Sequence, residues 1–175
     1  MGKLYLRNAN EGDSFFILGL ANNPECRKNS FNSEKIPLDV HMKWYDKLMH
    51  SDTDSLYVLM EEDIAVGQGR LELREGECRI SYSLIPERRG CGYGKILVAL
   101  LMKRALQDYP YCNIFFAEVL TGNFASQKIF EELSFVEKKG AKNTESLIYV
   151  MEREWIFNIP ASDLECKNTE KGYCS

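Results

Sequence analysis

The stretch of this sequence with the clearest capacity for chemistry is a glycine-rich loop that precedes an amphipathic helix. Gly90, Gly92 and Gly94 stand at alternate positions, and glycine lets the backbone adopt positive φ and approach a ligand closely. The helix that follows directs its terminal N–H groups and the positive end of its dipole at the loop, an arrangement that binds phosphate groups. Arg89 and Lys95 add positive charge. We therefore expect an anion-binding site here.

The spacing of the loop excludes two common kinds of phosphate-binding site. A P-loop has four residues between its glycines and a Lys-Ser/Thr pair after the second, whereas here three residues separate the first and third glycines and Ile96 stands where the hydroxyl would be. A dinucleotide-binding fold has a third glycine three residues after the second, and Lys95 occupies that position. What remains is the pattern Arg89-x-x-Gly92-x-Gly94, directly after an apolar strand.

A second motif follows the next apolar strand and makes the pattern specific. It reads Asn123-Phe-Ala-Ser126-Gln-Lys-Ile-Phe130-Glu-Glu-Leu-Ser134-Phe135. This stretch and the glycine loop, in this order and each after a strand, resemble the two cofactor signatures of the GNAT superfamily of acetyl-coenzyme A-dependent acetyltransferases. The resemblance covers roughly residues 3–154.

The resemblance implies that acetyl-CoA is the cosubstrate and defines how it binds. The fourth and fifth strands should splay apart, with the pantetheine arm between them and its thioester carbonyl polarised by nearby backbone groups. Backbone N–H groups of residues 89–94 should hold the pyrophosphate, because fixed donors stabilise negative charge. The expected cofactor-binding residues are Leu84, Ile85, Arg89, Gly90, Cys91, Gly92, Tyr93, Gly94, Lys95, Asn123 and Ser126.

Phe130 departs from the family pattern. Many members have a Tyr there that protonates the leaving thiolate, and phenylalanine has no proton to give. A general acid contributes roughly 10²–10⁴-fold, but a thiol with a pKa of about 8.5 is already a fair leaving group. The thiolate leaves unaided, takes a proton from water or from another group, or the fold is not catalytic; the sequence leaves these alternatives open. Ser134 replaces a glycine, which suggests a different helix end.

The early part of the chain should supply the acceptor site. The pattern Arg27-x-x-Ser30-Phe31-Asn32-x-x-x-Ile36-x-x-x-x-His41-x-x-Trp44-Tyr45 resembles the N-terminal region of bacterial acetyltransferases that act on amino-sugar nucleotides, including those of pseudaminic- and legionaminic-acid pathways. The expected substrate-binding residues are Arg27, Asn29, Phe31, His41 and Trp44. Arginine suits a phosphate, the aromatic rings suit a sugar or base, and His41 could also handle a proton. Core packing for His41 and Trp44, and a solvated loop for Arg27 and Asn29, are the alternatives.

Glu118 is the best candidate for a carboxylate base. It interrupts an otherwise apolar strand beside the expected cofactor cleft, so we expect it to be buried there. With His41 it forms the expected catalytic set. The alternative is a buried carboxylate that pairs with an arginine such as Arg70 or Arg79.

Hydrophobic periodicity predicts the elements that position these residues. Strands are expected at Leu4–Leu6, Ser55–Met60, Ile64–Arg74, Cys78–Ile85, Ile114–Leu120, Phe135–Lys138 and Leu147–Glu154, and helices at Phe15–Leu20, Val40–Leu48, Gly92–Asp108 and Phe124–Leu133. Residues 25–32 are expected to be a polar loop. The order predicts an α/β (mixed α+β) fold: a mixed, mostly antiparallel sheet of about seven strands with helices on both faces. Residues 1–157 form one domain and residues 158–175 a tail.

Composition limits the partners. A net charge of −4 gives no general attraction to nucleic acid, no apolar run reaches the length of a membrane span, and the six cysteines form no C-x-x-C pair. We expect a cytoplasmic protein with reduced thiols, no metal, no nucleic-acid or membrane partner, a small-molecule amine as substrate, and either a monomer or a homodimer.

Three functions fit the sequence. The first is an N-acetyltransferase that acts on an amino-sugar nucleotide by direct attack of the amine. The second is the same chemistry on a protein N-terminus or another small amine. The third, motivated by Phe130, is a CoA-binding module without activity.

Overall fold

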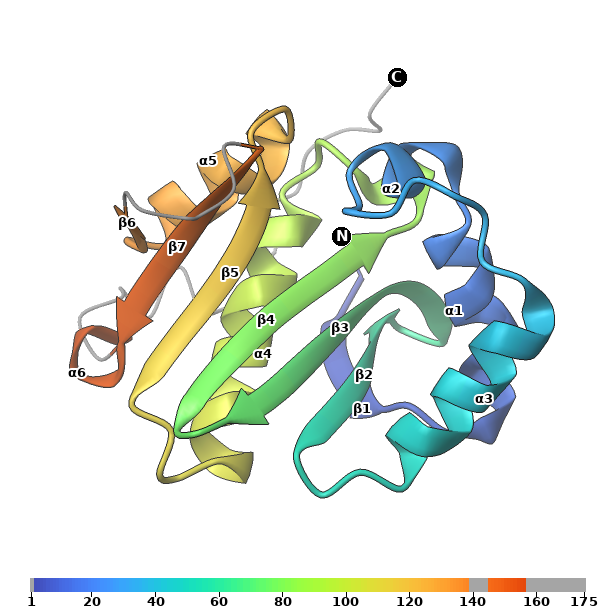
Figure 1. Ribbon diagram of the computed structural model, residues 1–175, viewed down its shortest axis with the longest axis horizontal. Coiled ribbons are helices and arrows are strands. Elements are labelled where there is room, and N and C mark those ends of the chain that lie inside the picture. The colour runs from blue at the N-terminus through green and yellow to red at the C-terminus, as the bar shows by residue number, and fades with distance from the viewer. Residues whose placement is uncertain (1, 139–144, 157–175) are drawn as a thin grey trace.

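The computed structural model of the protein describes residues 2–138 and 145–156, which form one seven-stranded sheet with helices around it (Figure 1). The strands are β1 (Leu4–Asn8), β2 (Asp54–Glu61), β3 (Ile64–Arg74), β4 (Glu77–Leu84), β5 (Ile114–Leu120), β6 (Val136–Lys138) and β7 (Ser146–Glu152). The helices are α1 (Ser14–Ala21), α2 (Pro24–Lys28), α3 (Leu38–Met49), α4 (Tyr93–Asp108), α5 (Phe124–Glu132) and α6 (Arg153–Ile156). The tail predicted at residues 158–175 lies outside the described residues.

The strand order is β1-β2-β3-β4-β5-β7-β6, and all neighbouring pairs are antiparallel except β4 and β5. The parallel pair is joined through α4, as a crossover connection requires. This confirms the predicted mixed, mostly antiparallel α/β sheet.

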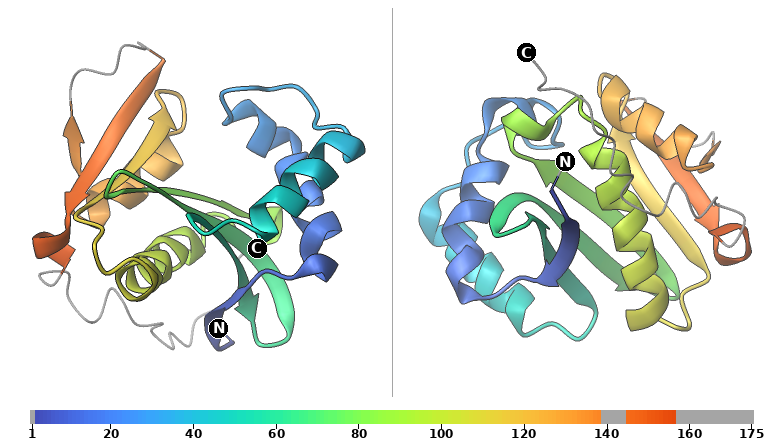
Figure 2. Two further views of the ribbon diagram at one scale, coloured as in Figure 1. Left: turned by 60° about the horizontal axis from the view of Figure 1, so that its bottom comes forward. Right: turned by 180° about the vertical axis from the view of Figure 1, so that it is seen from behind.

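The two parallel strands stay together only at their first residues. Paired positions run from Glu77 opposite Ile114 to Arg79 opposite Phe116, although β4 continues to Leu84 and β5 to Leu120. Beyond these positions the β1–β4 part of the sheet diverges from β5 and β7 (Figure 2). The predicted splay between the fourth and fifth strands is therefore present, and beyond Arg79 this edge of β4 has no strand partner among the described residues.

Both faces of the sheet are covered because the central strands are apolar on both sides. In β2, Tyr57 and Leu59 belong to the core under α4, whereas Leu56, Val58 and Met60 pack with Ile17 of α1 and with Tyr45 and Leu48 of α3. Successive side chains of a strand point to opposite faces, so a run of five buried residues requires helices on both. No helix in the described part of the chain is long and apolar enough to span a membrane.

Residues 25–32 were predicted to be a loop, and this prediction is wrong in its first half. Helix α2 begins at Pro24, a residue suited to the first helical turn, and the side chain of Asn23 accepts a hydrogen bond from the Glu25 N–H at 3.1 Å.

At the far end of α5, Ser134 adopts a φ of 64°. This is the left-handed conformation that glycine usually adopts after a helix. Ser134 therefore keeps the backbone conformation of the glycine that it replaces in the family pattern.

Candidate active site

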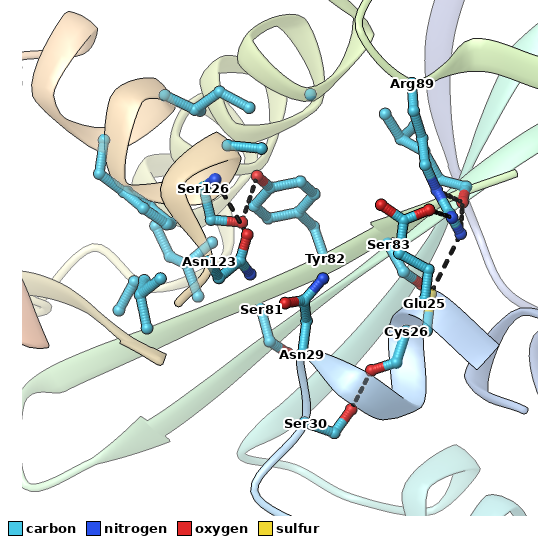
Figure 3. Close-up of a pocket in the computed structure, with 18 of the residues that line it drawn as sticks. Glu25, Cys26, Asn29, Ser30, Ser81, Tyr82, Ser83, Arg89, Asn123 and Ser126 are labelled. Carbon is cyan, nitrogen blue, oxygen red and sulfur yellow. Dashed lines mark hydrogen bonds and ion pairs between the residues drawn. The ribbon is translucent and has the colours of Figure 1, made fainter. Parts of the chain in front are cut away.

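A cavity of about 700 Å³ opens where β4 and β5 diverge. Its walls come from β4 with Gln68 of β3, the middle of β5, the glycine loop with the first turn of α4, one side of α5, and α2 with the loop that follows it (Figure 3). Of the predicted site residues, the following line it: Arg27, Asn29, Phe31, Leu84, Arg89, Gly90, Gly92, Gly94, Lys95, Glu118, Asn123 and Ser126. The sequence motifs are thus brought together at one place.

The glycine loop has the backbone shape that its sequence requires. Gly90 and Gly92 adopt φ values of 70° and 83°, a region that side chains rarely enter. Gly92 is the residue before α4 and offers no side chain to cap the helix. At Gly94, an added Cβ would lie 2.6 Å from Cδ1 of Ile129, so the first turn of α4 packs closely against the middle of α5. The loop presents backbone N–H groups and a helix dipole to the cavity, which suits a pyrophosphate.

Arg89 uses its side chain to join the loop to α2. Its guanidinium donates to the carbonyl of Leu84 at 3.0 and 3.1 Å and to Oδ1 of Asn23 at 3.1 Å. It also donates to the carboxylate of Glu25 (Figure 3). These bonds direct the charge toward α2 rather than toward the first turn of α4. Arg89 therefore holds the glycine loop and α2 in a fixed relation.

The backbone N–H groups of Leu84 and Ile85 point to opposite edges of β4. The N–H of Ile85 donates to the carbonyl of Val66 on β3 at 3.0 Å, so Ile85 faces the neighbouring strand and does not line the cavity. Alternate residues of a strand point their backbone groups to the same edge, so Leu84 points its N–H toward the gap beside β5. Of these two residues, only Leu84 therefore directs its N–H group toward the gap.

Two further loop residues are turned away from the cavity. The thiol of Cys91 lies 3.4 Å from the carbonyl of Arg89, and the hydroxyl of Tyr93 donates to Glu61. Neither side chain lines the cavity. Their expected contribution is therefore limited to backbone N–H groups.

Asn123 and Ser126 form the first turn of the α5 wall. Oδ1 of Asn123 accepts the N–H of Ser126 at 3.2 Å and so caps the helix. The hydroxyl of Ser126 lies 3.0 Å from the hydroxyl of Tyr82 on β4 (Figure 3). Burial raises the pKa of Tyr82 to about 12, although its bond to Ser126 acts in the opposite direction.

Arg27 organises the loop after α2. Its guanidinium donates to the carbonyls of Ala21, Asn32 and Glu34, the last two at 3.2 and 3.4 Å, and to the hydroxyl of Ser30 at 3.2 Å. These bonds occupy the donors that were expected to hold a phosphate. Phe31 lies at the cavity with half its surface exposed, 52%.

His41 and Trp44 lie outside the cavity, which corrects their predicted roles. His41 is only 2% exposed, its Nε2 lies 2.9 Å from the carbonyl oxygen of Ser14, and its ring centroid lies 5.4 Å from that of Trp44. Burial lowers the pKa of His41, and the Ser14 carbonyl offsets part of this effect. Trp44 packs under the guanidinium of Arg70 at 5.4 Å. Both residues hold α3 against its neighbours.

Glu118 lines the cavity and is not buried, because the divergence of β4 from β5 opens space beside it. Its side chain is 31% exposed. Oε2 lies 3.4 Å from a guanidinium nitrogen of Arg79, and Oε1 accepts a hydrogen bond from Ser146 at 3.0 Å. Of the two arginines considered as partners, Arg70 pairs instead with Asp54 and Glu72, at 3.1 and 3.0 Å.

The polar side chains of β3 and β4 were missed by sequence reasoning. Ser81, Ser83 and Gln68 line the cavity, with Nε2 of Gln68 donating to Ser83 at 3.1 Å. The alternation of polar and apolar residues in β4 is the signal that could have found them. Tyr82 gave no such signal, because it occupies an apolar position of that alternation. In residues 2–138 and 145–156, no cluster of His, Cys, Asp and Glu is arranged to hold a metal ion.

Comparison with solved structures shows the same fold in acetyltransferases. The spermidine N-acetyltransferase from Vibrio cholerae, in complex with CoA and spermine, aligns with a TM-score of 0.79 at 18% identity over 89% of this chain and 98% of that one. The aminoglycoside acetyltransferase AAC(6')-Ib in complex with coenzyme A gives 0.76 at 15% identity, over 89% and 98%. A domain from Methanocaldococcus jannaschii DSM 2661 gives 0.77 at 19% identity, over 87% and 99%.

Sequence comparison identifies the family. No curated protein matches the chain. The family model described as "Acetyltransferase (GNAT) domain" matches residues 3–136, which include both the glycine loop and the Asn123 motif. On this match, and in agreement with the splayed sheet and the glycine loop at the start of α4, the chain belongs to the GNAT acetyltransferase family.

Proposed function

We propose that the protein transfers the acetyl group of acetyl-CoA to a primary amine by direct attack of the amine on the thioester. The observation that carries this proposal is the continuity of the cavity from the glycine loop, along the free edge of β4, to the polar residues of the acceptor side. Bound acetyl-CoA supplies an activated carbonyl; the protein holds its phosphates at Gly90–Gly94 and its pantetheine arm beside Leu84 and Asn123.

Each protein group has a distinct part in this reaction. The N–H of Leu84 stabilises the negative charge that develops on the carbonyl oxygen, and one fixed donor of this kind contributes roughly 10²–10³ in rate. The carboxylate of Glu118 receives the proton that the attacking amine must lose, directly or through water. Arg79 and Ser146 hold that carboxylate in place.

The charges of the cavity oppose a polycationic acceptor. The acidic residues that line it are Glu25, Glu118 and Glu132, and the basic ones are Arg27, Arg79, Arg89, Lys95 and Lys128. Each of these three carboxylates lies in an ion pair with one of the basic residues, with Arg89, Arg79 and Lys95 respectively. A polyamine would therefore have to compete for carboxylates that are already neutralised, and the basic excess would repel it.

The acceptor side fits a hydroxylated amine instead. Ser81, Ser83, Gln68 and Asn29 offer neutral hydrogen-bonding groups, and Phe31 exposes a ring at the cavity on which a sugar or base can stack. We infer that the acceptor is an amino sugar carried as its nucleotide. Its anionic phosphates agree with the basic excess of the lining residues, whereas Arg27 is engaged in the loop and is not assigned to them.

Release of free CoA from acetyl-CoA tests both parts of the proposal. The purified protein is given a 4-amino sugar nucleotide, the corresponding free amino sugar, spermidine, or a short peptide with a free N-terminus, and thiol is titrated. We expect turnover with the sugar nucleotide and little with spermidine. A preference for spermidine or the peptide would overturn the acceptor assignment. Binding of CoA without turnover of any amine would overturn the enzymatic function and leave a CoA-binding module.

A further inference from the structure

The aromatic ring of Phe130 is enclosed and offers no hydroxyl to a leaving group. It is 1% exposed, with its centroid 5.1 Å from Phe135, 5.8 Å from Tyr149 and 6.2 Å from Tyr82. Its place in this cluster is that of a packing residue. A side-chain donor for the departing sulfur must therefore come from another residue of the cavity.

Tyr82 brings a hydroxyl to that part of the cavity from strand β4. Its ring packs edge-on against Phe130, and its hydroxyl lies 3.0 Å from the hydroxyl of Ser126, in the first turn of α5. The same hydroxyl lies 3.7 Å from the position that a Cβ on Gly94, in the first turn of α4, would occupy. The phenol thus sits between two helix N-termini, where positive dipole ends stabilise negative charge.

We propose that the hydroxyl of Tyr82 donates a hydrogen bond to the sulfur of CoA as the carbon–sulfur bond breaks, and so takes the place of the missing hydroxyl at Phe130. The electron pair of that bond goes to the sulfur, and the amine proton goes to Glu118 or water. The thiolate finally takes its proton from solvent. This inference rests on the proposed acetyl transfer and assigns Tyr82 to its leaving-group side.

The environment of Tyr82 favours donation of a hydrogen bond over transfer of the proton. Because burial raises the pKa of Tyr82 to about 12, the phenol stays protonated at neutral pH. A thiol has a pKa of about 8.5, so complete transfer of the phenolic proton to the thiolate would be uphill. A hydrogen bond to a charged group needs no such transfer and is among the stronger ones in proteins.

The test compares two tyrosines that touch the same phenylalanine. Tyr82→Phe removes the hydroxyl in the cavity and keeps the ring, whereas Tyr149→Phe removes a hydroxyl that bonds to Glu131 at 3.2 Å and does not line the cavity. In single-turnover acetyl transfer we expect Tyr82→Phe to lose about 10- to 100-fold in rate, with CoA affinity unchanged. Tyr149→Phe should keep the wild-type rate.

Rescue distinguishes a leaving-group role from packing. Adding Phe130→Tyr to Tyr82→Phe returns a hydroxyl to the same region, and we expect the rate to recover at least in part. If Tyr82→Phe does not fold, replacing Tyr82 with 3-fluorotyrosine keeps the ring and strengthens the donor, and the single-turnover rate should rise. An unchanged rate in Tyr82→Phe, or in the fluorinated protein, overturns the proposal. A wild-type protein that acetylates no amine would instead overturn the proposed function.

Discussion

Substitution of Gly92, whose φ is 83°, tests whether the glycine loop binds the pyrophosphate of CoA. Its effect on the stability of the fold can be measured separately from its effect on CoA binding. An added Cβ at Gly92 meets no atom within 4 Å, so Gly92→Ala introduces backbone strain and no clash inside the protein. A left-handed non-glycine residue costs about 1–2 kcal/mol, which corresponds to a fall in Tm of roughly 2–8 °C for a chain of this size. The added methyl group would, however, lie on the loop whose backbone we expect to contact the phosphates, and it would keep them from approaching closely.

Gly76, in the turn between β3 and β4, is a matched control. It has the same φ of 83°, its added Cβ also meets no atom within 4 Å, and it does not line the cavity. Gly76→Ala and Gly92→Ala should therefore lower Tm by similar amounts. Only Gly92→Ala should weaken CoA binding, by about tenfold or more, because hydrogen bonds to charged groups contribute roughly 1.5–3 kcal/mol each.

Calorimetric titration of both variants with CoA, together with thermal denaturation, measures the two effects separately. If Gly92→Ala binds CoA as tightly as Gly76→Ala does, the glycine loop is not the pyrophosphate site. If Gly76→Ala loses CoA affinity equally, the effect at Gly92 is a consequence of strain and not of contact with the ligand.

Two other residues give independent predictions. Glu118→Gln keeps the size of the side chain and its contact with Arg79 but removes the proton acceptor, so kcat should fall roughly 10²–10⁴-fold while CoA affinity is retained; an unchanged kcat would exclude Glu118 as the base. Burial lowers the pKa of His41, so the unfolded state takes up a proton that the folded state resists, and stability should fall as pH drops below about 6.5. His41→Gln, which can still donate to the Ser14 carbonyl, should show a smaller loss in urea unfolding between pH 7 and 5.5, and an equal loss would assign the pH dependence to other groups.

Local sequence signals predicted the strands, the longer helices and the glycine loop before α4, because each depends on residues close in the chain. The glycines before α4 and the cap at Asn123 determine the backbone only of the adjoining helical turn. In β2, the continuous run of apolar residues indicates a strand that is buried on both faces. Helix α2 was missed because its five residues, Pro-Glu-Cys-Arg-Lys, are too few to show an apolar periodicity.

The errors at the site all concern contacts between distant segments. His41 shares an apolar helical face with core residues, and only the Ser14 carbonyl shows that its ring is used inside the fold. Glu118 was expected to be buried because an apolar strand normally has neighbours along its whole length, whereas β4 leaves β5 after three paired positions. Tyr82 shares its face of β4 with apolar residues, so its access to the cavity follows only from the way α4 and α5 approach it.

A crystal structure of the protein with CoA tests the central claim most directly. The pyrophosphate should contact backbone N–H groups of Gly90–Gly94, the pantetheine arm should run along the free edge of β4 between Asn123 and Leu84, and the sulfur should lie near the hydroxyl of Tyr82. CoA bound elsewhere, or β4 and β5 paired beyond Arg79 with the cavity closed, would contradict it.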